Sequence, residues 1–162
     1  MSNKTACEHY TVIRDTQEKN NYWDFPEGYL CNGTVPAKLK TGDYSLAGLE
    51  NIFSIERKAN TGEFSKNITE KRFERELIRL DAMPQAYLML EFSWNDIDSF
   101  PYNSGIPSRY WGELRVSSGF LRKRLIEIMS DYNIQVILCE DKGRFLAELI
   151  FRRMNEVYNV KK

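Results

Sequence analysis

The sequence contains few of the residues that build disulfide frameworks, zinc sites and histidine-based active sites. Its three cysteines, Cys7, Cys31 and Cys139, are widely spaced and odd in number, so they fit neither a set of disulfides nor a zinc site. The single histidine, His9, argues against a cluster of histidine metal ligands and against a histidine-based catalytic triad. The acidic and basic side chains remain as the main candidates for chemistry.

The sequence also lacks a long hydrophobic run and an excess of one charge. No segment approaches the length of a membrane-spanning helix, and the first ten residues, MSNKTACEHY, lack the apolar centre of a signal peptide. We therefore expect a cytosolic protein. The 23 basic and 23 acidic residues give a formal net charge of zero, which argues against strong non-specific binding to nucleic acid but is compatible with a local basic patch.

The length and the hydrophobic pattern predict one α/β domain with a core at about 10–158. The chain has 162 residues, of which 42% are hydrophobic, enough to bury a core of its own. Strands or extended segments are expected at 10–15, 34–46 with a turn at Thr41–Gly42, 51–58, 86–92 and 134–139. Helices are expected at 64–80, 117–132 and 143–158, and a loop at 93–108. This order indicates a mixed central β-sheet flanked by helices.

Two of the expected strands, 86–92 and 134–139, are nearly continuous apolar runs, which is typical of strands buried on both faces. Pro36, by contrast, indicates that its strand lies at an edge of the sheet or begins there.

The last expected helix carries more apolar residues than one buried face needs. We expect its core-facing residues to be Leu146, Leu149, Ile150, Met154 and Val157. Two further aromatic residues, Phe151 and Tyr158, fall on other faces of the helix. We interpret this excess as the surface of a homodimer with Phe151 or Tyr158 at its interface, and the alternative is that both cover this domain's own core.

An acid and a lysine lie close together on the strand at 51–58. Side chains in a strand alternate between its two faces, so Glu56 and Lys58 point to the same side. If the strand that Asp43 opens pairs with this one, the two carboxylates converge at one end of the sheet. Two convergent carboxylates suit Mg²⁺, which prefers oxygen ligands, and such an ion promotes phosphodiester hydrolysis. The alternative is an exposed salt bridge at the end of a strand.

The residues around this trio carry a resemblance to a known family. The stretches GDY at 42–44 and IERK at 55–58 resemble the Gly-Asp and Glu-Arg-Lys elements of the XPF-type structure-specific nuclease domain, which has the restriction-endonuclease-like fold. DTQEK at 15–19 is similar to the Asp-x-Arg-Glu element of that family, and RFERELIRL at 72–80 is similar to its next helix. AYLMLE and IQVILCED are similar to its two later strands. The resemblance extends from about Tyr10 to Met154 and is weakest over 93–116.

Two positions depart from the pattern of the family. Its arginine in the first element is Gln17 here, and the acid that it carries four residues after the lysine falls on Gly62. A one-residue insertion would give that role to Glu63. The tandem helix-hairpin-helix module of many relatives is also not expected, so the resemblance implies a stand-alone nuclease domain over 1–162, of the kind found in small phage and mobile-element proteins.

The resemblance implies roles for six residues. It makes Asp43 and Glu56 ligands of Mg²⁺, for which Mn²⁺ would substitute, with the backbone carbonyl of Arg57 as a third ligand. It makes Lys58 the catalytic lysine, and Arg57 a residue that holds a phosphate or braces the site. An alternative for Arg57 is a solvated side chain on the opposite face of the strand. Asp15 and Glu18 would line the site, whereas a structural role is expected for Glu91.

Two groups of basic residues are candidates for contacts with DNA. Lys71, Arg75 and Arg79 are four residues apart and would form one ridge on a helix, with Arg72 beside it. The alternative is an ordinary solvated face, because Glu70, Glu74 and Glu76 lie between them. Arg122, Lys123 and Arg124 form the second group. Tyr110 and Trp111 precede it, and the alternatives for these two rings are stacking on unpaired bases or a place in the core.

We therefore expect an Mg²⁺-dependent DNA endonuclease that cuts at branched, flap or fork structures in repair or recombination. It would act in the cytoplasm of a bacterial or phage-infected cell, or in the nucleus if its host is eukaryotic, as a homodimer or with a partner subunit. One alternative is a non-catalytic DNA-binding or scaffolding module of the same fold, which Gln17 and Gly62 favour. Another is a nuclease similar to junction resolvases.

Overall fold

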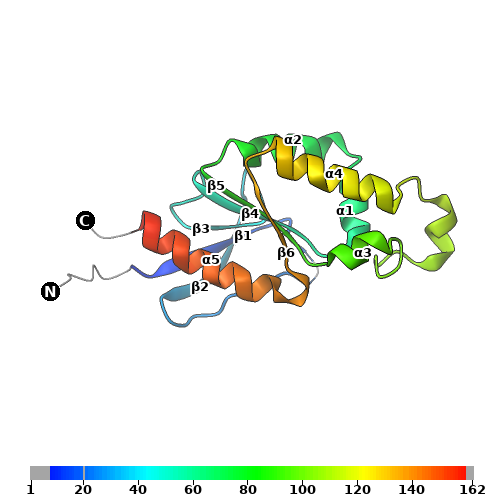
Figure 1. Ribbon diagram of the computed structural model, residues 1–162. Coiled ribbons are helices and arrows are strands. Elements are labelled where there is room, and N and C mark those ends of the chain that lie inside the picture. The colour runs from blue at the N-terminus through cyan, green and yellow to red at the C-terminus, as the bar shows by residue number, and fades with distance from the viewer. Residues whose placement is uncertain (1–7, 20, 160–162) are drawn as a thin grey trace.

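A computed structural model describes residues 8–19 and 21–159 of the chain. A six-stranded mixed sheet lies at its centre (Figure 1), with the strands in the order β2-β1-β3-β4-β5-β6. The strands are β1 (Tyr10–Asp15), β2 (Cys31–Ala37), β3 (Tyr44–Leu46), β4 (Phe53–Lys58), β5 (Gln85–Leu90) and β6 (Gln135–Leu138). β3 runs antiparallel to β1 and β4, and the other neighbouring strands are parallel. The predicted mixed α/β sheet is thus confirmed.

Helices cover both faces of the sheet and form two separate cores. The first core lies under α1 (Thr61–Asn67), α2 (Lys71–Asp81), α3 (Trp94–Asp98) and α4 (Ser118–Asp131). The second core lies under α5 (Gly143–Tyr158) and includes aromatic side chains from the chain that follows β1. Strand residues alternate between the cores: Leu88 and Leu90 of β5 contribute to the first, and Met89 to the second. Short 3-10 helices span Ser108–Glu113 and Glu140–Lys142.

The single helix expected at 64–80 is wrong, because α1 and α2 are separate helices. The side-chain amide of Asn60 caps α1, and the chain turns at Ile68 before Glu70 takes an extended conformation. Nine residues separate Phe64 from Phe73, which is about two and a half helical turns. A continuous helix would therefore point these two rings to opposite sides, and the break allows both to enter the first core.

The loop expected at 93–108 also contains a helix. Ser93 and Asp96 form a capping box in which each side chain accepts the backbone N–H of the other residue. This arrangement starts the short helix α3, whose Ile97 is fully buried. The Ser-x-x-Asp spacing was the available sequence signal for it.

Two predictions about burial at the end of the chain are wrong. β6 is an edge strand that pairs only with β5, and its residues are half-buried or exposed rather than buried. In α5, Leu149 and Val157 are 42% and 47% exposed, whereas Phe151 is fully buried. Phe151 contacts the rings of Tyr10, Phe25 and Phe53, so it cannot form a dimer interface. Tyr158 is half-buried against the same core.

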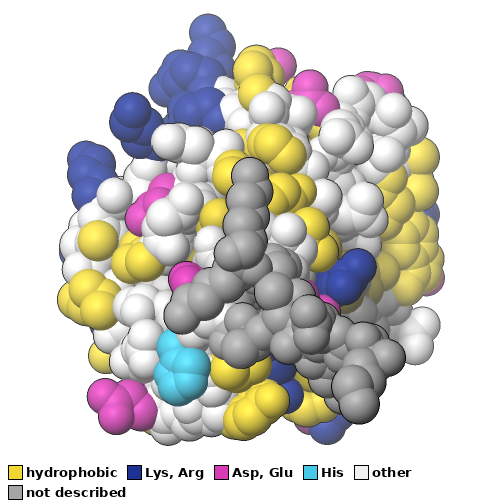
Figure 2. All heavy atoms as spheres, turned by 90° about the vertical axis from the view of Figure 1, so that its left-hand side faces the viewer, with side chains coloured by type: hydrophobic (Ala, Val, Ile, Leu, Met, Phe, Trp, Pro, Cys, Tyr) yellow, Lys and Arg dark blue, Asp and Glu magenta, His cyan; other side chains and the backbone are white. Residues whose placement is uncertain are grey.

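The face that carries both chain ends mixes polar, basic and hydrophobic side chains (Figure 2). His9 lies on this surface and hydrogen-bonds the side chain of Asn32, which belongs to the edge strand β2. Over the residues that the structure describes, each helix is too short or too polar to cross a membrane.

Candidate active site

The pairing of β3 with β4 brings Asp43 next to the end of β4. Tyr44 is the register partner of Ile55, and the backbone N–H of Asp43 donates to the carbonyl of Ile55 at 2.7 Å. The carboxylate Oδ2 of Asp43 in turn accepts the backbone N–H of Arg57 at 2.8 Å. The hairpin expected from the sequence is confirmed, and its Asp43 side chain crosses to the strand that carries Glu56.

Glu56 and Lys58 form a buried ion pair on one face of β4. Nζ of Lys58 lies 2.7 Å from Oε1 of Glu56, and these residues are only 6% and 7% exposed. The ammonium also lies 4.9 Å from the centre of the Phe73 ring, which α2 places above it. The alternative of an exposed strand-end salt bridge therefore does not describe this pair.

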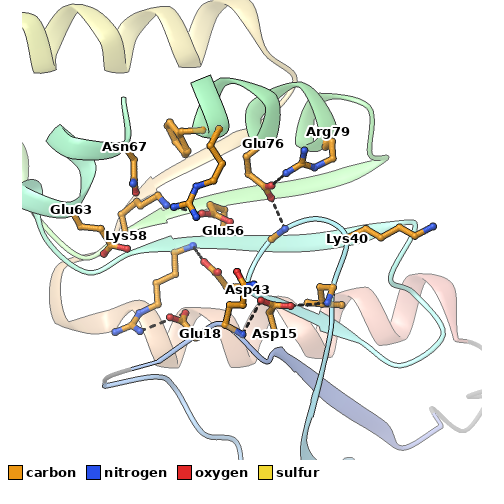
Figure 3. A pocket seen from close by; sticks show the side chains of 16 residues that line it. Asp15, Glu18, Lys40, Asp43, Glu56, Lys58, Glu63, Asn67, Glu76 and Arg79 are labelled. Carbon is orange, nitrogen blue, oxygen red and sulfur yellow. Dashed lines mark hydrogen bonds and ion pairs between the residues drawn. The ribbon is translucent and has the colours of Figure 1, made fainter. Parts of the chain in front are cut away.

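A cavity of about 330 Å³ opens at this end of the sheet (Figure 3). Its acidic lining comes from the turn after β1, the hairpin and the helices α1 and α2, and comprises Asp15, Glu18, Asp43, Glu56, Glu63 and Glu76. Its basic lining comprises Lys40, Arg57, Lys58, Arg72 and Arg79. The cavity therefore brings together all six residues predicted for the catalytic site and two of those predicted for DNA.

The carboxylates at the bottom of the cavity are destabilised in their charged form. Burial, followed by the charges of Glu56 and Glu18, raises the pKa of Asp43 well above its usual range. Burial also raises the pKa of Glu56, although the neighbouring Lys58 partly opposes this. The pKa of Glu18 is raised to about 7, chiefly by burial. A cation placed among these groups would relieve their mutual repulsion.

Lys58 keeps its proton in this environment. Burial alone would lower the pKa of its ammonium, but the negative charges of Glu56 and Asp43 outweigh burial and raise that pKa. In this structure Lys58 is therefore a hydrogen-bond donor to Glu56 and a positive charge.

Arg57 points to the face of β4 opposite Glu56. The alternative of a solvated side chain on that face is wrong, however, because Arg57 is buried. Its guanidinium forms ion pairs with Glu91, at the end of β5, and with Glu18. It also lies over the ring of Trp23, 4.9 Å from the ring centre. This position makes Arg57 a brace between two strands and the turn after β1.

Asp15 and Glu18 reach the cavity in different ways. Asp15 accepts the backbone N–H of Leu39 at 2.7 Å and that of Gln17 at 3.1 Å. It thereby fixes the loop between β2 and β3 to the end of β1. Oε2 of Glu18 is buried without a hydrogen-bond donor and lies 3.7 Å from the guanidinium of Arg57.

The geometry also explains why an acid is missing at Gly62. A side-chain carbon at that position would lie 2.3 Å from the carbonyl oxygen of Ser104, so only glycine fits. The next residue, Glu63, lines the cavity, and its carboxylate accepts the backbone N–H of Ala59 at 2.8 Å. The N-cap residue Asn60 accepts the N–H of Glu63 in return, which holds the first turn of α1.

Sequence reasoning missed the role of Glu76, which it placed on a solvated face of α2. Oε1 of Glu76 accepts the backbone N–H of Gly42 at 2.6 Å, and its other oxygen pairs with Arg79. Gly42 has φ = 77°, and an added side-chain carbon would lie 1.9 Å from Oγ of Ser54. Glu76 and this tight turn together hold the backbone directly before Asp43. A carboxylate among the basic residues of α2 was the only sequence signal.

The predicted DNA-binding residues divide into three groups. Arg72 and Arg79 line the cavity, whereas Lys71 and Arg75 are exposed on α2 outside it. Arg122 pairs with Asp98, and both Lys123 and Arg124 pair with Glu127.

The residues present fit a divalent metal ion. In the described part of the chain, no three His, Cys, Asp or Glu side chains are arranged to hold a metal ion, so protein ligation would come from two carboxylates and backbone. The N–H of Arg57 points to Asp43, and in a strand the carbonyl of the same residue points to the same side. Asp43, Glu56 and this carbonyl thus provide oxygen atoms only, as Mg²⁺ and Mn²⁺ prefer.

Comparison with known proteins decides the family. The model of the ERCC4 domain matches residues 14–149. The chain belongs to the ERCC4 domain family. The part of this ERCC4 domain that matches contains the complete cavity lining, from Asp15 to Arg79.

Solved structures share the fold of this ERCC4 domain. XPF from Aeropyrum pernix in complex with DNA superposes with a TM-score of 0.59 and 19% identity, over 91% of this chain and 66% of that one. A second structure of XPF from the same organism superposes with a TM-score of 0.58 and 20% identity, over 89% of this chain and 61% of that one. The domain thus spans less than two thirds of either XPF chain. No curated protein sequence matches it. The chain is thereby an XPF-type nuclease domain by family and by fold.

Proposed function

We propose that the protein is a metal-dependent DNA endonuclease that hydrolyses phosphodiester bonds at branched, flap or fork structures. The observation that carries the proposal is the trio of Asp43, Glu56 and Lys58 at the bottom of an open cavity. Membership of the ERCC4 family and the likeness to an XPF in complex with DNA support DNA as the substrate.

Asp43, Glu56 and the carbonyl of Arg57 would hold Mg²⁺, and Mn²⁺ would substitute because it prefers the same oxygen ligands. A divalent ion bound there supplies Lewis-acid polarisation of the scissile phosphate. The backbone N–H of Arg57 fixes Oδ2 of Asp43, which leaves Oδ1 to face the ion. Lys58 holds Oε1 of Glu56 in the same manner.

Lys58 is the residue closest to a bound phosphate in this proposal. Its ammonium keeps three N–H donors, of which Glu56 accepts one. The remaining donors stabilise negative charge that develops on the phosphoryl oxygens, and a positioned donor of this kind acts most strongly where water is excluded. Glu63, Asp15 and Glu18 are further acids of the cavity lining, and Glu18 pairs with Arg57.

The DNA backbone would approach along α2, from its first turn to its last. Arg72 and Arg79 lie at the cavity, and the exposed Lys71 and Arg75 extend the basic ridge outwards. Contacts from such residues to phosphates position a nucleic acid without reading its sequence. Arg122 and Lys123 on α4 would contact DNA further from the cut.

We also propose that the protein works as a homodimer. α5 exposes Phe145, Leu149 and Val157, which lie within about one third of its circumference. We therefore expect the dimer interface at this surface and not at Phe151, which is buried.

Cleavage assays test the catalytic proposal. Linear, flap, fork and junction DNAs are incubated with the protein in Mg²⁺ or in EDTA, and we expect cleavage of the branched substrates in Mg²⁺ only. Asp43→Ala and Glu56→Ala should remove cleavage and retain DNA binding, whereas Glu50→Ala, an exposed acid in the β3–β4 turn, should cut normally. Cleavage by either site variant at the rate of the unaltered protein would show that the site is assigned wrongly.

The same assay separates the alternatives. Gln17, which is exposed where the family has an arginine, favours a non-catalytic module. Binding to branched DNA without cleavage in Mg²⁺ or Mn²⁺ would support that module, and cleavage restricted to four-way junctions would support a resolvase-like enzyme.

A further inference from the structure

The segment between α3 and α4 presents aromatic rings to solvent. Tyr102 is 63% exposed and Tyr110 is 45% exposed, and Trp111 beside them is half-buried. Large aromatic rings usually add to a core, so three at one surface position are unusual for a monomeric domain. We call Tyr102, Arg109, Tyr110 and Trp111 the aromatic platform.

The rings of the platform are held in place by specific contacts. Tyr102 packs edge-on against Trp111 with 4.9 Å between ring centres. Nε1 of Trp111 donates to the carbonyl of Ile106 at 2.8 Å. The guanidinium of Arg109 lies over the Tyr110 ring, 4.7 Å from its centre, and holds that ring from one side. A ligand that binds here therefore meets rings that are already ordered.

The charge around the platform fits a polyanion. Residues 100–124 contain five basic residues and one acid, Glu113. Arg122 and the two residues after it pair with carboxylates of α3 and α4. Among the described residues, however, Arg109 and Arg115 form no ion pair, although both are exposed. Arg109, over the Tyr110 ring, and Arg115, four residues after Trp111, are thus without a carboxylate partner among the described residues.

The platform is connected to the candidate active site through α1. The carbonyl of Ser104 accepts the N–H of Gly62 at 3.1 Å, and Gly105 packs closely on the side chain of Asn60. Asn60 caps α1, whose Glu63 and Asn67 line the cavity. In Figure 1 this segment extends beyond α1 and α3, at the end of the molecule away from the two chain termini.

We propose that the aromatic platform binds a DNA single strand by stacking its unpaired bases. This inference rests on the proposed function and adds a second DNA-binding surface to the candidate active site. Exposed rings beside guanidinium groups that have no carboxylate partner suit bases and phosphates together. A duplex would not use the rings, because its bases already stack on one another.

Binding measured in EDTA tests the platform independently of cleavage. Fluorescence anisotropy compares a labelled oligothymidine strand with a blunt duplex of equal length. Tyr102→Ala and Tyr110→Ala should each weaken binding of the single strand about fivefold or more, the range reported for loss of one stacked base. Tyr102→Phe and Tyr110→Phe keep the rings and should bind like the unaltered protein. Tyr29→Ala removes a ring that is 78% exposed and lies away from the platform, and it serves as the control.

Each result either supports or overturns the platform. Unchanged binding of the single strand, an equal loss for strand and duplex, or no binding of the single strand by the unaltered protein would overturn it. A dimer that Tyr110→Ala dissociates would assign the rings to a protein interface instead. If the protein cleaves branched DNA but the alanine variants bind the single strand normally, only the platform is ruled out. If the alanine variants lose single-strand binding but the unaltered protein does not cleave any DNA, only the proposed nuclease function is ruled out.

Discussion

Among single residues, Lys58 has the most demanding position in the molecule. It is buried, yet its charge is compensated by Glu56 at 2.7 Å and by the nearby Asp43. A buried lysine with two acids is costly to maintain for stability alone, since well-packed apolar side chains often serve as well. Its retention is explained if the charge is used in the reaction.

Substitution of Lys58 separates chemistry from metal binding. Lys58→Met keeps much of the length of the side chain and removes the charge, so we expect the cleavage rate to fall about a hundredfold or more. The affinity for Mn²⁺, measured by calorimetry, should stay equal or increase, because the ammonium opposes a cation beside Glu56. An unchanged cleavage rate with weakened Mn²⁺ binding would assign Lys58 a structural role.

The acidic cluster makes the stability of the metal-free protein depend on pH. The folded-state pKa values of Asp43, Glu56 and Glu18 are raised, to about 7 for Glu18, so the folded protein binds protons more tightly than the unfolded chain. The contribution of these three groups to stability is therefore greatest below the ordinary carboxyl range and is lost as the pH rises towards 7. Denaturant unfolding in EDTA at pH 5 and pH 8 measures the difference.

Neutralising one acid should reduce the repulsion among these carboxylates. Asp43→Asn keeps an oxygen that can accept the N–H of Arg57, and we expect about 1 kcal/mol more stability at pH 8 in EDTA. Mg²⁺ should raise the melting temperature of the unaltered protein and not that of the variant. A variant that is less stable at pH 8 would contradict the repulsion inferred here.

At the scale of elements, α2 and the turn before β3 act as one unit. Glu76 reaches from the helix to the N–H of Gly42, and Ser54 of β4 fills the space under that glycine. The position of Asp43 is thus set from three elements rather than by its own strand alone.

Glu76 is predicted to be a positioning residue for Asp43. Glu76→Ala should lower the cleavage rate about tenfold and raise the Mg²⁺ concentration that gives half-maximal rate, because the loss of one hydrogen bond loosens the turn. Glu76→Gln keeps the acceptor and should retain most activity. Glu74→Ala, an exposed acid on the same helix, is the control. If Glu76→Ala needs the same Mg²⁺ concentration as the unaltered protein, Glu76 does not position Asp43.

The exposed part of the basic ridge gives a separate prediction about DNA affinity. Lys71→Gln and Arg75→Gln should each weaken binding to all sequences alike and reduce the slope of log affinity against log salt by about 0.9. Lys142→Gln, on a different element, should leave the slope unchanged. Equal slopes in all three variants would show that Lys71 and Arg75 do not contact DNA and belong to an ordinary solvated helix face.

The sequence predicts those parts of the structure that depend on local pattern. The strand alternation around Glu56 and Lys58 and the turn at Gly42 indicated both the hairpin and the convergence of carboxylates. The break between α1 and α2 was not predicted, because each half has its own helical pattern and only the half-turn offset between Phe64 and Phe73 separates them. Contacts such as Glu76 with Gly42 join residues 34 positions apart, and no local pattern records them.

For the whole molecule, the open question is its assembly. A monomer has a mass of 19.1 kDa, and we expect light scattering at micromolar concentration to give twice this value. Phe145→Asp with Leu149→Asp should yield a folded monomer, because both side chains are exposed. Phe151→Asp should instead unfold the protein, because its ring packs on Tyr10, Phe25 and Phe53. A monomeric unaltered protein would exclude the dimer.

The order of strands in the sheet has a consequence for how the chain folds during synthesis. After β1 and β2 pair, each later strand joins the edge formed by an earlier one, so the sheet can grow in the order in which the ribosome releases it. The second core, however, is covered by α5, whose Phe151 arrives only after all six strands. Nascent chains therefore carry an uncovered aromatic face for most of their translation, and this interval is when chaperones would be needed most.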